Sequence, residues 1–180
     1  MISKRILFCF ICLFIINSIF GESIDDSKYN DAATIEFGLQ DKNGNYFCLY
    51  HNVNNIKNFN TKNYDVVAQW GHAMWVKKDK EDFSITWNET NGAILILKTT
   101  STDYMTRRGI KVGDSITKIN EVYKDCAPWQ QNYNGKVIVG FRKANMLEEE
   151  MMTMAFWTEK GIITSIEILV GENESWIDRN

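Results

Sequence analysis

A chain of 180 residues is long enough for one domain or two small ones, and an apolar content of 44% is enough to build a hydrophobic core, which excludes general disorder. The formal net charge is −3, so the composition offers no basic surface of the kind that binds nucleic acid or anionic membranes. We therefore expect no nucleic-acid partner.

Residues 1–21 have the three-part pattern of a secretory signal peptide. Lys4 and Arg5 precede an apolar run from Ile6 to Phe20, and Gly21 offers a small residue for cleavage. The run of about 15 residues is shorter than the roughly 20 that a membrane-spanning helix needs, so an uncleaved anchor is the less favoured alternative. We predict a protein that is exported, either to the periplasm or as a secreted protein, with no stable membrane span after cleavage.

The first half of the chain predicts a hairpin, a short helix and a second hairpin. Residues 22–33 are polar without periodicity, which is typical of a flexible leader. Strand-like alternation then surrounds a turn at 41–44, and 61–70 is predicted as a capped helix because Tyr64, Val67 and Ala68 would share one face. The segment 83–97 predicts the second hairpin around a turn at 88–92.

The second half predicts a helix over 115–124, a loop over 130–135, a strand over 136–141 and a third hairpin over 151–170, before a polar tail at 172–180. Residues 34–101 and 102–171 are thus two similar halves with a helix and a hairpin each. The alternative is that aromatic strands and glycine turns resemble one another because sheets require them. The predicted fold class is α+β, an antiparallel sheet with short helices packed on one face.

The string Gly113-Asp114-Ser115-Ile116-Thr117 resembles the nucleophile block of hydrolases of the Gly-Asp-Ser-Leu type. In that family the serine is activated by a histidine from an Asp-x-x-His near the C-terminus. No histidine follows residue 72 in this chain, so the serine has no base. We instead interpret Asp114 and Ser115 as the cap of an amphipathic helix that ends near Tyr123.

The wider pattern Thr-x-x-Gly-Ile-x-x-Gly-Asp-Ser over 106–115, followed by a short helix ending in Tyr123, resembles a motif of uncharacterised exported bacterial proteins. Those proteins usually end the helix with Tyr-Gly, and Lys124 stands in place of that glycine. The order of helix and hairpin is also similar to exported helix-on-sheet modules such as the β-lactamase-inhibitor proteins and the small lipoprotein of the outer-membrane assembly machine. The resemblance implies an architecture and carries no binding residue over.

Cysteines and histidines give few candidate sites. Cys48 and Cys126 remain after signal cleavage, and in an exported protein such a pair is a candidate disulfide; the alternative is two small buried thiols. Neither His51 nor His72 stands at a zinc-ligand spacing from another ligand. We therefore predict no metal site and no cofactor.

Tryptophans offer the remaining candidate contact residues. Trp129, in a predicted loop, and Trp176, in the tail, are the two that we expect to be exposed for contact with a partner. The function that we favour on fold analogy is a non-catalytic binding module of the bacterial periplasm or exterior, contacting a protein or a cell-envelope component. The alternatives are a small carboxylate-dependent hydrolase or carbohydrate-active enzyme, and a structural envelope protein. The sequence leaves the oligomeric state open.

Overall fold

The computed structural model describes residues 36–56, 61–69, 72–77, 81–134, 136–145 and 150–171. The predicted signal peptide, leader and tail lie outside the described residues and stay predictions. Within the described part of the chain, no helix combines the length and the apolar character that crossing a membrane requires.

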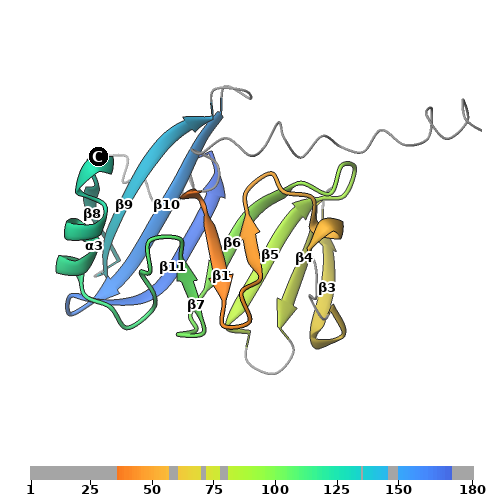
Figure 1. The fold of residues 1–180 in the computed structure, drawn as a ribbon, viewed down its shortest axis with the longest axis horizontal. Helices are drawn as coiled ribbons and strands as arrows, with labels where there is room; N and C mark the ends of the chain where they lie inside the picture. Colours follow the sequence, from red (N-terminus) through yellow and green to blue (C-terminus); the bar gives the residue numbers. More distant parts are fainter. Residues whose placement is uncertain are drawn as a thin grey trace, which may run out of the picture.

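The largest element is an eight-stranded antiparallel sheet (Figure 1). Its strands are β3 (Tyr64–Gln69), β4 (His72–Lys77), β5 (Phe83–Asn88), β6 (Ile94–Thr99), β8 (Trp129–Tyr133), β9 (Lys136–Asn145), β10 (Glu150–Glu159) and β11 (Ile162–Val170). The spatial order is β3-β4-β5-β6-β11-β10-β9-β8. Two runs of four consecutive strands therefore meet where β6 pairs antiparallel with β11.

A second layer lies on one face of this sheet (Figure 1). It consists of the small sheet, with the order β2-β1-β7, and of one helix. The members of this layer are β1 (Gly38–Asp41), β2 (Tyr46–Cys48), β7 (Tyr104–Thr106) and α3 (Ile116–Val122). Short 3-10 turns complete the described chain: η2 (Val53–Asn55), η3 (Thr61–Asn63) and η4 (Lys124–Cys126).

The predicted fold class, α+β with packed helices, is wrong. The described chain is mostly strand, and the one α-helix that lies wholly within it, α3, has only seven residues. The expected helix over 61–70 is replaced by the turn η3 and the strand β3. Tyr64, Val67 and Ala68 fit a helical spacing, but the adjacent β-branched residues Val66 and Val67 favour a strand, and the whole segment pairs with β4.

The three predicted hairpins are confirmed as the antiparallel pairs β1–β2, β5–β6 and β10–β11. The predicted loop over 130–135 is wrong for most of its length, because residues 129–133 form the edge strand β8 against β9. The two similar halves, 34–101 and 102–171, stay a prediction. Each half contributes a run of four consecutive strands to the large sheet.

The hydrophobic core lies between the two layers. On one side, Phe83 of β5 stacks on Tyr104 of β7, with 4.0 Å between the ring centroids and an interplanar angle of 9°. On the other side, Tyr123 at the end of α3 lies 4.6 Å from Phe141 of β9, also between ring centroids. The core face of the large sheet is therefore covered by the small sheet and by α3.

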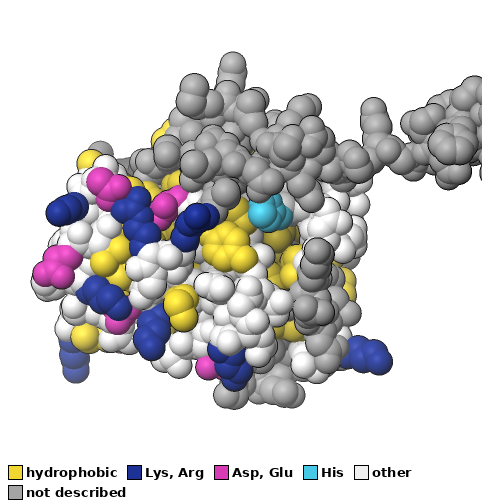
Figure 2. Space-filling model, viewed as in Figure 1, with side chains coloured by type: hydrophobic (Ala, Val, Ile, Leu, Met, Phe, Trp, Pro, Cys, Tyr) yellow, Lys and Arg dark blue, Asp and Glu magenta, His cyan; other side chains and the backbone are white. Residues whose placement is uncertain are grey.

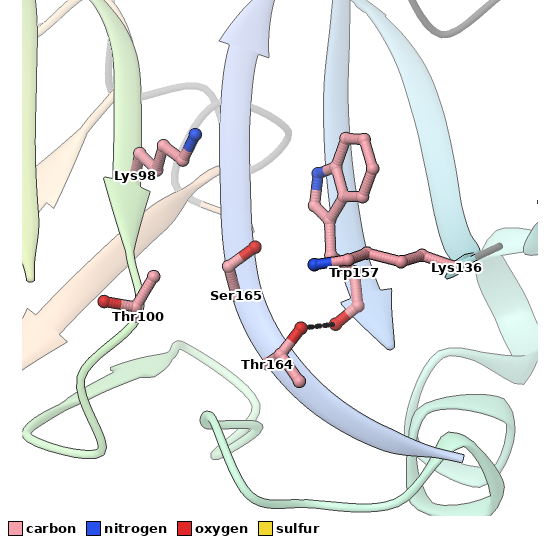
Figure 3. Close-up of a pocket in the computed structure, with 6 residues that line it drawn as sticks. All are labelled: Lys98, Thr100, Lys136, Trp157, Thr164 and Ser165. Carbon is pink, nitrogen blue, oxygen red and sulfur yellow. Dashed lines mark hydrogen bonds between the residues drawn. The ribbon is translucent and has the colours of Figure 1, made fainter. Parts of the chain in front are cut away.

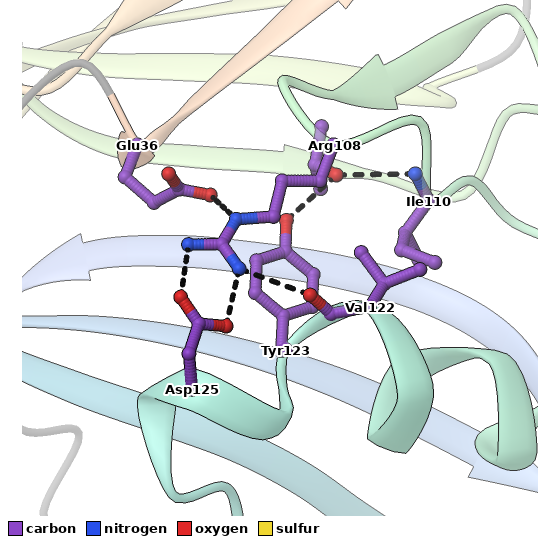
Figure 4. A network of polar contacts seen from close by, with 7 residues as sticks. Glu36, Arg108, Ile110, Val122, Tyr123 and Asp125 are labelled. Atoms are coloured by element: carbon purple, nitrogen blue, oxygen red, sulfur yellow. Dashed lines mark hydrogen bonds and ion pairs between the residues drawn. The ribbon is translucent and has the colours of Figure 1, made fainter.

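A polar network holds the end of α3 against the start of β1 (Figure 4). The Arg108 guanidinium donates to Glu36 Oε1 at 2.7 Å and to the Val122 carbonyl at 2.9 Å, and it binds both carboxylate oxygens of Asp125. It also lies 4.9 Å from the centre of the Tyr123 ring, as a cation–π contact. Arg108 thus connects three segments that are distant in sequence.

The start of α3 is capped by side chains. Ser115 is the N-cap residue, and its hydroxyl accepts a hydrogen bond from the Lys118 backbone N–H at 3.2 Å. The Asp114 carboxylate accepts from the Lys111 N–H and from Lys118 Nζ. Burial acts to raise the pKa of Asp114, but these hydrogen bonds outweigh it and the pKa lies below its ordinary value. The serine hydroxyl is therefore part of the helix start.

We expect Ser115→Ala to lower the free energy of unfolding by about 1 kcal/mol, because the first turn loses its acceptor. Urea denaturation measures this difference. Thr117→Ala, on the exposed side of the same helix, is the matched control and should change stability by less than about 0.5 kcal/mol. Equal midpoints for Ser115→Ala and the parent protein would contradict the cap.

Candidate functional site

The face of the eight-stranded sheet opposite the small sheet and α3, here called the outer face, carries the candidate site. Strand alternation determines which side chains reach it. In β11, Ile166 and Ile168 are buried in the core, whereas Ser165 and Glu167 are on the outer face. By contrast, basic and acidic side chains are interspersed around α3 on the face that carries the second layer (Figure 2). That region is therefore neither a positively nor a negatively charged patch.

The outer face has an apolar cluster of its own. Its buried members are Ile138, Ala155 and Leu169, and partly buried side chains surround them: Ile96, Trp129, Tyr133 and Trp157. All of these residues belong to the large sheet, and neither the small sheet nor α3 contributes to the cluster. An apolar cluster rich in aromatic residues on an outward face is the kind of surface that binds a ligand.

A pocket of about 450 Å³ lies beside this cluster (Figure 3). We call it the outer-face pocket, and its lining residues come from β6, β9, β10 and β11 and from the residue after β6: Lys98, Thr100, Lys136, Trp157, Thr164 and Ser165. Figure 3 shows the two lysine side chains reaching toward β11 from opposite sides. The lining thus combines one aromatic ring, two ammonium groups and three hydroxyls.

Trp157 forms the aromatic wall of the pocket. Tyr133 packs edge-on against its ring, with 5.8 Å between the centroids and an angle of 82°. The pairing of β10 with β11 shifts register between Trp157 and Thr158, and a bulge of this kind changes the direction in which neighbouring side chains point. The Thr164 hydroxyl donates to the Trp157 carbonyl at 3.2 Å and ties the two strands together there.

Glu167 is a partly buried carboxylate next to the pocket. It lies opposite Lys98 in the β6–β11 register and opposite Ala155 in β10, and its carboxylate accepts a hydrogen bond from the Trp157 side chain. Burial raises the pKa of Glu167 above its ordinary value, although Lys98 and the Trp157 hydrogen bond act in the opposite direction. This carboxylate therefore sits between a fixed donor and a cation.

The second lysine of the pocket also has an acidic neighbour. Lys136 Nζ lies 2.8 Å from Glu159 Oε1, and both side chains are largely solvent-accessible. The hydrogen bond from Lys136 lowers the pKa of Glu159, whereas the pKa of Glu167 is raised. Each basic group at the pocket is thus matched by an acidic group, and the site has no strong net charge.

The Glu167 pKa gives a testable pH dependence. A carboxyl group whose folded-state pKa exceeds its unfolded-state pKa binds more protons when folded, so stability falls as the pH rises from about 4.5 through the raised value. We expect Glu167→Gln to remove this fall, so that the variant gains stability relative to the parent protein as the pH rises to 7. Urea denaturation at several pH values measures the difference.

Glu159→Gln is the matched control for this experiment. The pKa of Glu159 is lowered, so its contribution to stability is present above the ordinary carboxyl pKa and is lost as the pH falls. As the pH rises, the stability of Glu167→Gln relative to the parent protein should therefore increase, whereas that of Glu159→Gln should decrease. A Glu167→Gln difference that stays constant between pH 4 and 7 would contradict the raised pKa.

The chemistry of this arrangement suits binding. A nucleophile needs an adjacent base, and a pair of catalytic carboxylates needs one acid and one base that face the same bond. Glu167 instead contacts Trp157 and faces Lys98, and Glu159 bonds to Lys136. Among the residues that the structure describes, no three His, Cys, Asp or Glu side chains converge on a point where they could hold a metal ion.

The structure places the two predicted contact tryptophans differently. Trp129 is not in a loop: it lies in β8 and packs across the strand pair on Gly140, where an added Cβ would come within 2.8 Å of the indole. Trp129 therefore belongs to the apolar cluster of the outer face but does not line the pocket. Trp176 lies outside the described residues.

The remaining predicted residues lie elsewhere in the molecule. Cys48 and Cys126 carry thiols in this structure and are not joined by a disulfide. Burial raises the pKa of the Cys48 thiol to about 12, so the thiol stays protonated and unreactive at neutral pH. Asp114 and Ser115, at the start of α3, are engaged in hydrogen bonds to the backbone and to Lys118.

Comparison with known proteins adds no relative. The chain matches no protein-family model, no curated protein and no solved structure. The similarity to exported inhibitor modules therefore stays a prediction.

Sequence reasoning missed the pocket residues Lys98 and Lys136, and it did not count Trp157 among the tryptophans expected to be exposed. One signal was present, because Ser165 and Glu167 alternate with the apolar residues Ile166 and Ile168 and so mark a second face of β11. The partners of that face could not be derived, because they come from strands on both sides of β11 in the sheet.

Proposed function

We propose that this protein is an exported, non-catalytic binding module that takes its ligand in the outer-face pocket. The observation that supports the proposal most directly is the pocket itself, with an aromatic wall and both donors and acceptors around it. The pairing of each carboxylate with a basic group favours binding over hydrolysis. Export follows from the predicted signal peptide, and the ligand is then a component found outside the cytoplasm.

Capture of envelope material on the immobilised protein tests this proposal. We expect wild-type protein to retain a component at near-physiological salt, and the variants Trp157→Ala and Lys98→Met to retain much less of it. Met105→Ala is the matched control, because Met105 is 37% exposed on β7, in the layer on the opposite side of the molecule. Retention of the same material by all four proteins would contradict a ligand site on the outer face, and so would the absence of any retained component.

A further inference from the structure

The aromatic wall of the outer-face pocket suits a ligand with a flat, weakly polar face. Trp157, Lys98 and Lys136 all line the pocket, and the Lys136 side chain passes close to the base of Trp157 in Figure 3, whereas Lys98 lies across β11. A ligand that fills the pocket can therefore meet the indole and the two ammonium groups. The face of an indole ring is electron-rich and attracts C–H groups with a small positive charge. One face of a sugar ring is largely C–H, and its rim carries hydroxyls.

The polar groups of the pocket match those hydroxyls. A sugar hydroxyl both donates and accepts, so a site that recognises it needs both kinds of group. Lys98 and Lys136 donate, and the hydroxyls of Thr100, Thr164 and Ser165 can accept. Hydrogen bonds in which one partner is ionised are also the stronger ones.

The charge balance argues against an ionic ligand. An anion bound by Lys98 would draw that ammonium away from Glu167 and leave a partly buried carboxylate next to a negative charge. A cation would meet Lys98 and Lys136 directly. A neutral ligand avoids both costs, because the lysines can keep their acidic neighbours while they donate to hydroxyls.

We infer that the ligand of the outer-face pocket is a neutral saccharide, held by stacking on Trp157 and by hydrogen bonds from Lys98 and Lys136. The pocket volume of about 450 Å³ lies within the roughly 300–1,000 Å³ of small-molecule sites. This inference rests on the proposed function and names the chemical class of its ligand.

Titration with defined trisaccharides tests the inference. The neutral probes are tri-N-acetylchitotriose, cellotriose and maltotriose, and the charged probes are trigalacturonate and the protonated glucosamine trimer. Binding is followed by calorimetry, since tryptophan fluorescence would change with the variants themselves. We expect at least one neutral trisaccharide to bind more tightly than either charged probe. Its affinity should change by less than about twofold between about 50 mM and 0.5 M salt, because no net charge is neutralised.

Variants of the pocket sharpen the test. Trp157→Ala should weaken the binding of that trisaccharide by about tenfold or more, which corresponds to about 1.4 kcal/mol. Trp157→Phe should lose less affinity than Trp157→Ala, because phenylalanine keeps an aromatic ring on which the sugar can stack. Lys98→Met should weaken binding several-fold, whereas the control Met105→Ala should bind like wild type. Because Lys98→Met also removes the cation next to Glu167, urea denaturation must first show that this variant is folded under the binding conditions.

Three results would overturn the inference: no neutral trisaccharide binds, a charged trisaccharide binds more tightly, or Trp157→Ala and Lys98→Met both bind like wild type. The capture experiment separates this failure from that of the proposed function. If capture of envelope material depends on Lys98 but no trisaccharide binds, the binding module stands and its ligand is of another class, for example a protein. If a bound trisaccharide is cleaved, the ligand class stands and the non-catalytic function is wrong.

Discussion

Replacing Phe83 with alanine is expected to lower the free energy of unfolding by about 3–5 kcal/mol, the cost of removing a buried aromatic side chain. Phe83 is buried on the core face of β5, where it stacks on Tyr104 and lies 5.1 Å from the Phe47 ring, between centroids. These two partners belong to β7 and β2. The substitution therefore opens a cavity between the two layers and weakens the attachment of the small sheet.

Equilibrium denaturation in urea measures the effect. Phe83→Leu should cost less than Phe83→Ala, because it keeps most of the buried volume. Val66→Ala is the control, since Val66 is 60% exposed on the edge strand β3, and it should change stability by less than about 0.5 kcal/mol. A loss of less than about 1 kcal/mol for Phe83→Ala would contradict the packing of the two layers.

The elements that could be predicted from the sequence are those with local signals. Each of the three hairpins is defined by a turn with glycine, and Gly44, Gly92 and Gly161 all have a positive φ, which glycine adopts without strain. The start of α3 was likewise visible, because Asp114 and Ser115 precede an apolar pattern with helical spacing. Local chemistry was sufficient in these places.

The segment 64–69 shows where local signals were not sufficient. Its apolar residues fit a helix as well as a strand, and the choice is made by pairing with β4. β8 is a similar case, because the polar residues Gln130 and Asn132 suggest a loop although they are the exposed side of an edge strand. In both places the strand forms because a neighbour supplies its hydrogen bonds.

The candidate site could be predicted only in part, for the same reason. Alternation in β11 separates Glu167 from Ile166 and Ile168 without any knowledge of the fold. The position of Lys98 next to Glu167 depends on the pairing of β6 with β11, whose residues are about 70 positions apart. No local pattern encodes a pairing between segments so distant in sequence.

Replacing Arg108 with methionine is expected to lower the free energy of unfolding by about 2 kcal/mol, because hydrogen bonds to a charged group are lost and Glu36 loses its partner. The Glu36 side chain is only 17% exposed, so water compensates poorly for that loss. Arg108→Lys should recover only part of the stability, since an ammonium group cannot bind the two Asp125 oxygens as a planar guanidinium does. Urea denaturation at neutral pH measures these differences.

The control for Arg108→Met is Lys42→Met, which breaks an ion pair between Lys42 and Asp103 whose side chains are 67% and 44% exposed. Ion pairs this exposed contribute little, so the stability of this variant should differ from that of the parent protein by less than about 0.5 kcal/mol.

The pH dependence of the Arg108→Met effect gives a second test. The hydrogen bond from Arg108 lowers the pKa of Asp125. The ion pair therefore stabilises the fold above the ordinary carboxyl pKa, and this stabilisation is lost as the pH falls and Asp125 is protonated. The difference between the parent protein and Arg108→Met should therefore narrow in acid; a difference that is no larger than that of Lys42→Met at pH 7 would contradict a structural role for this network.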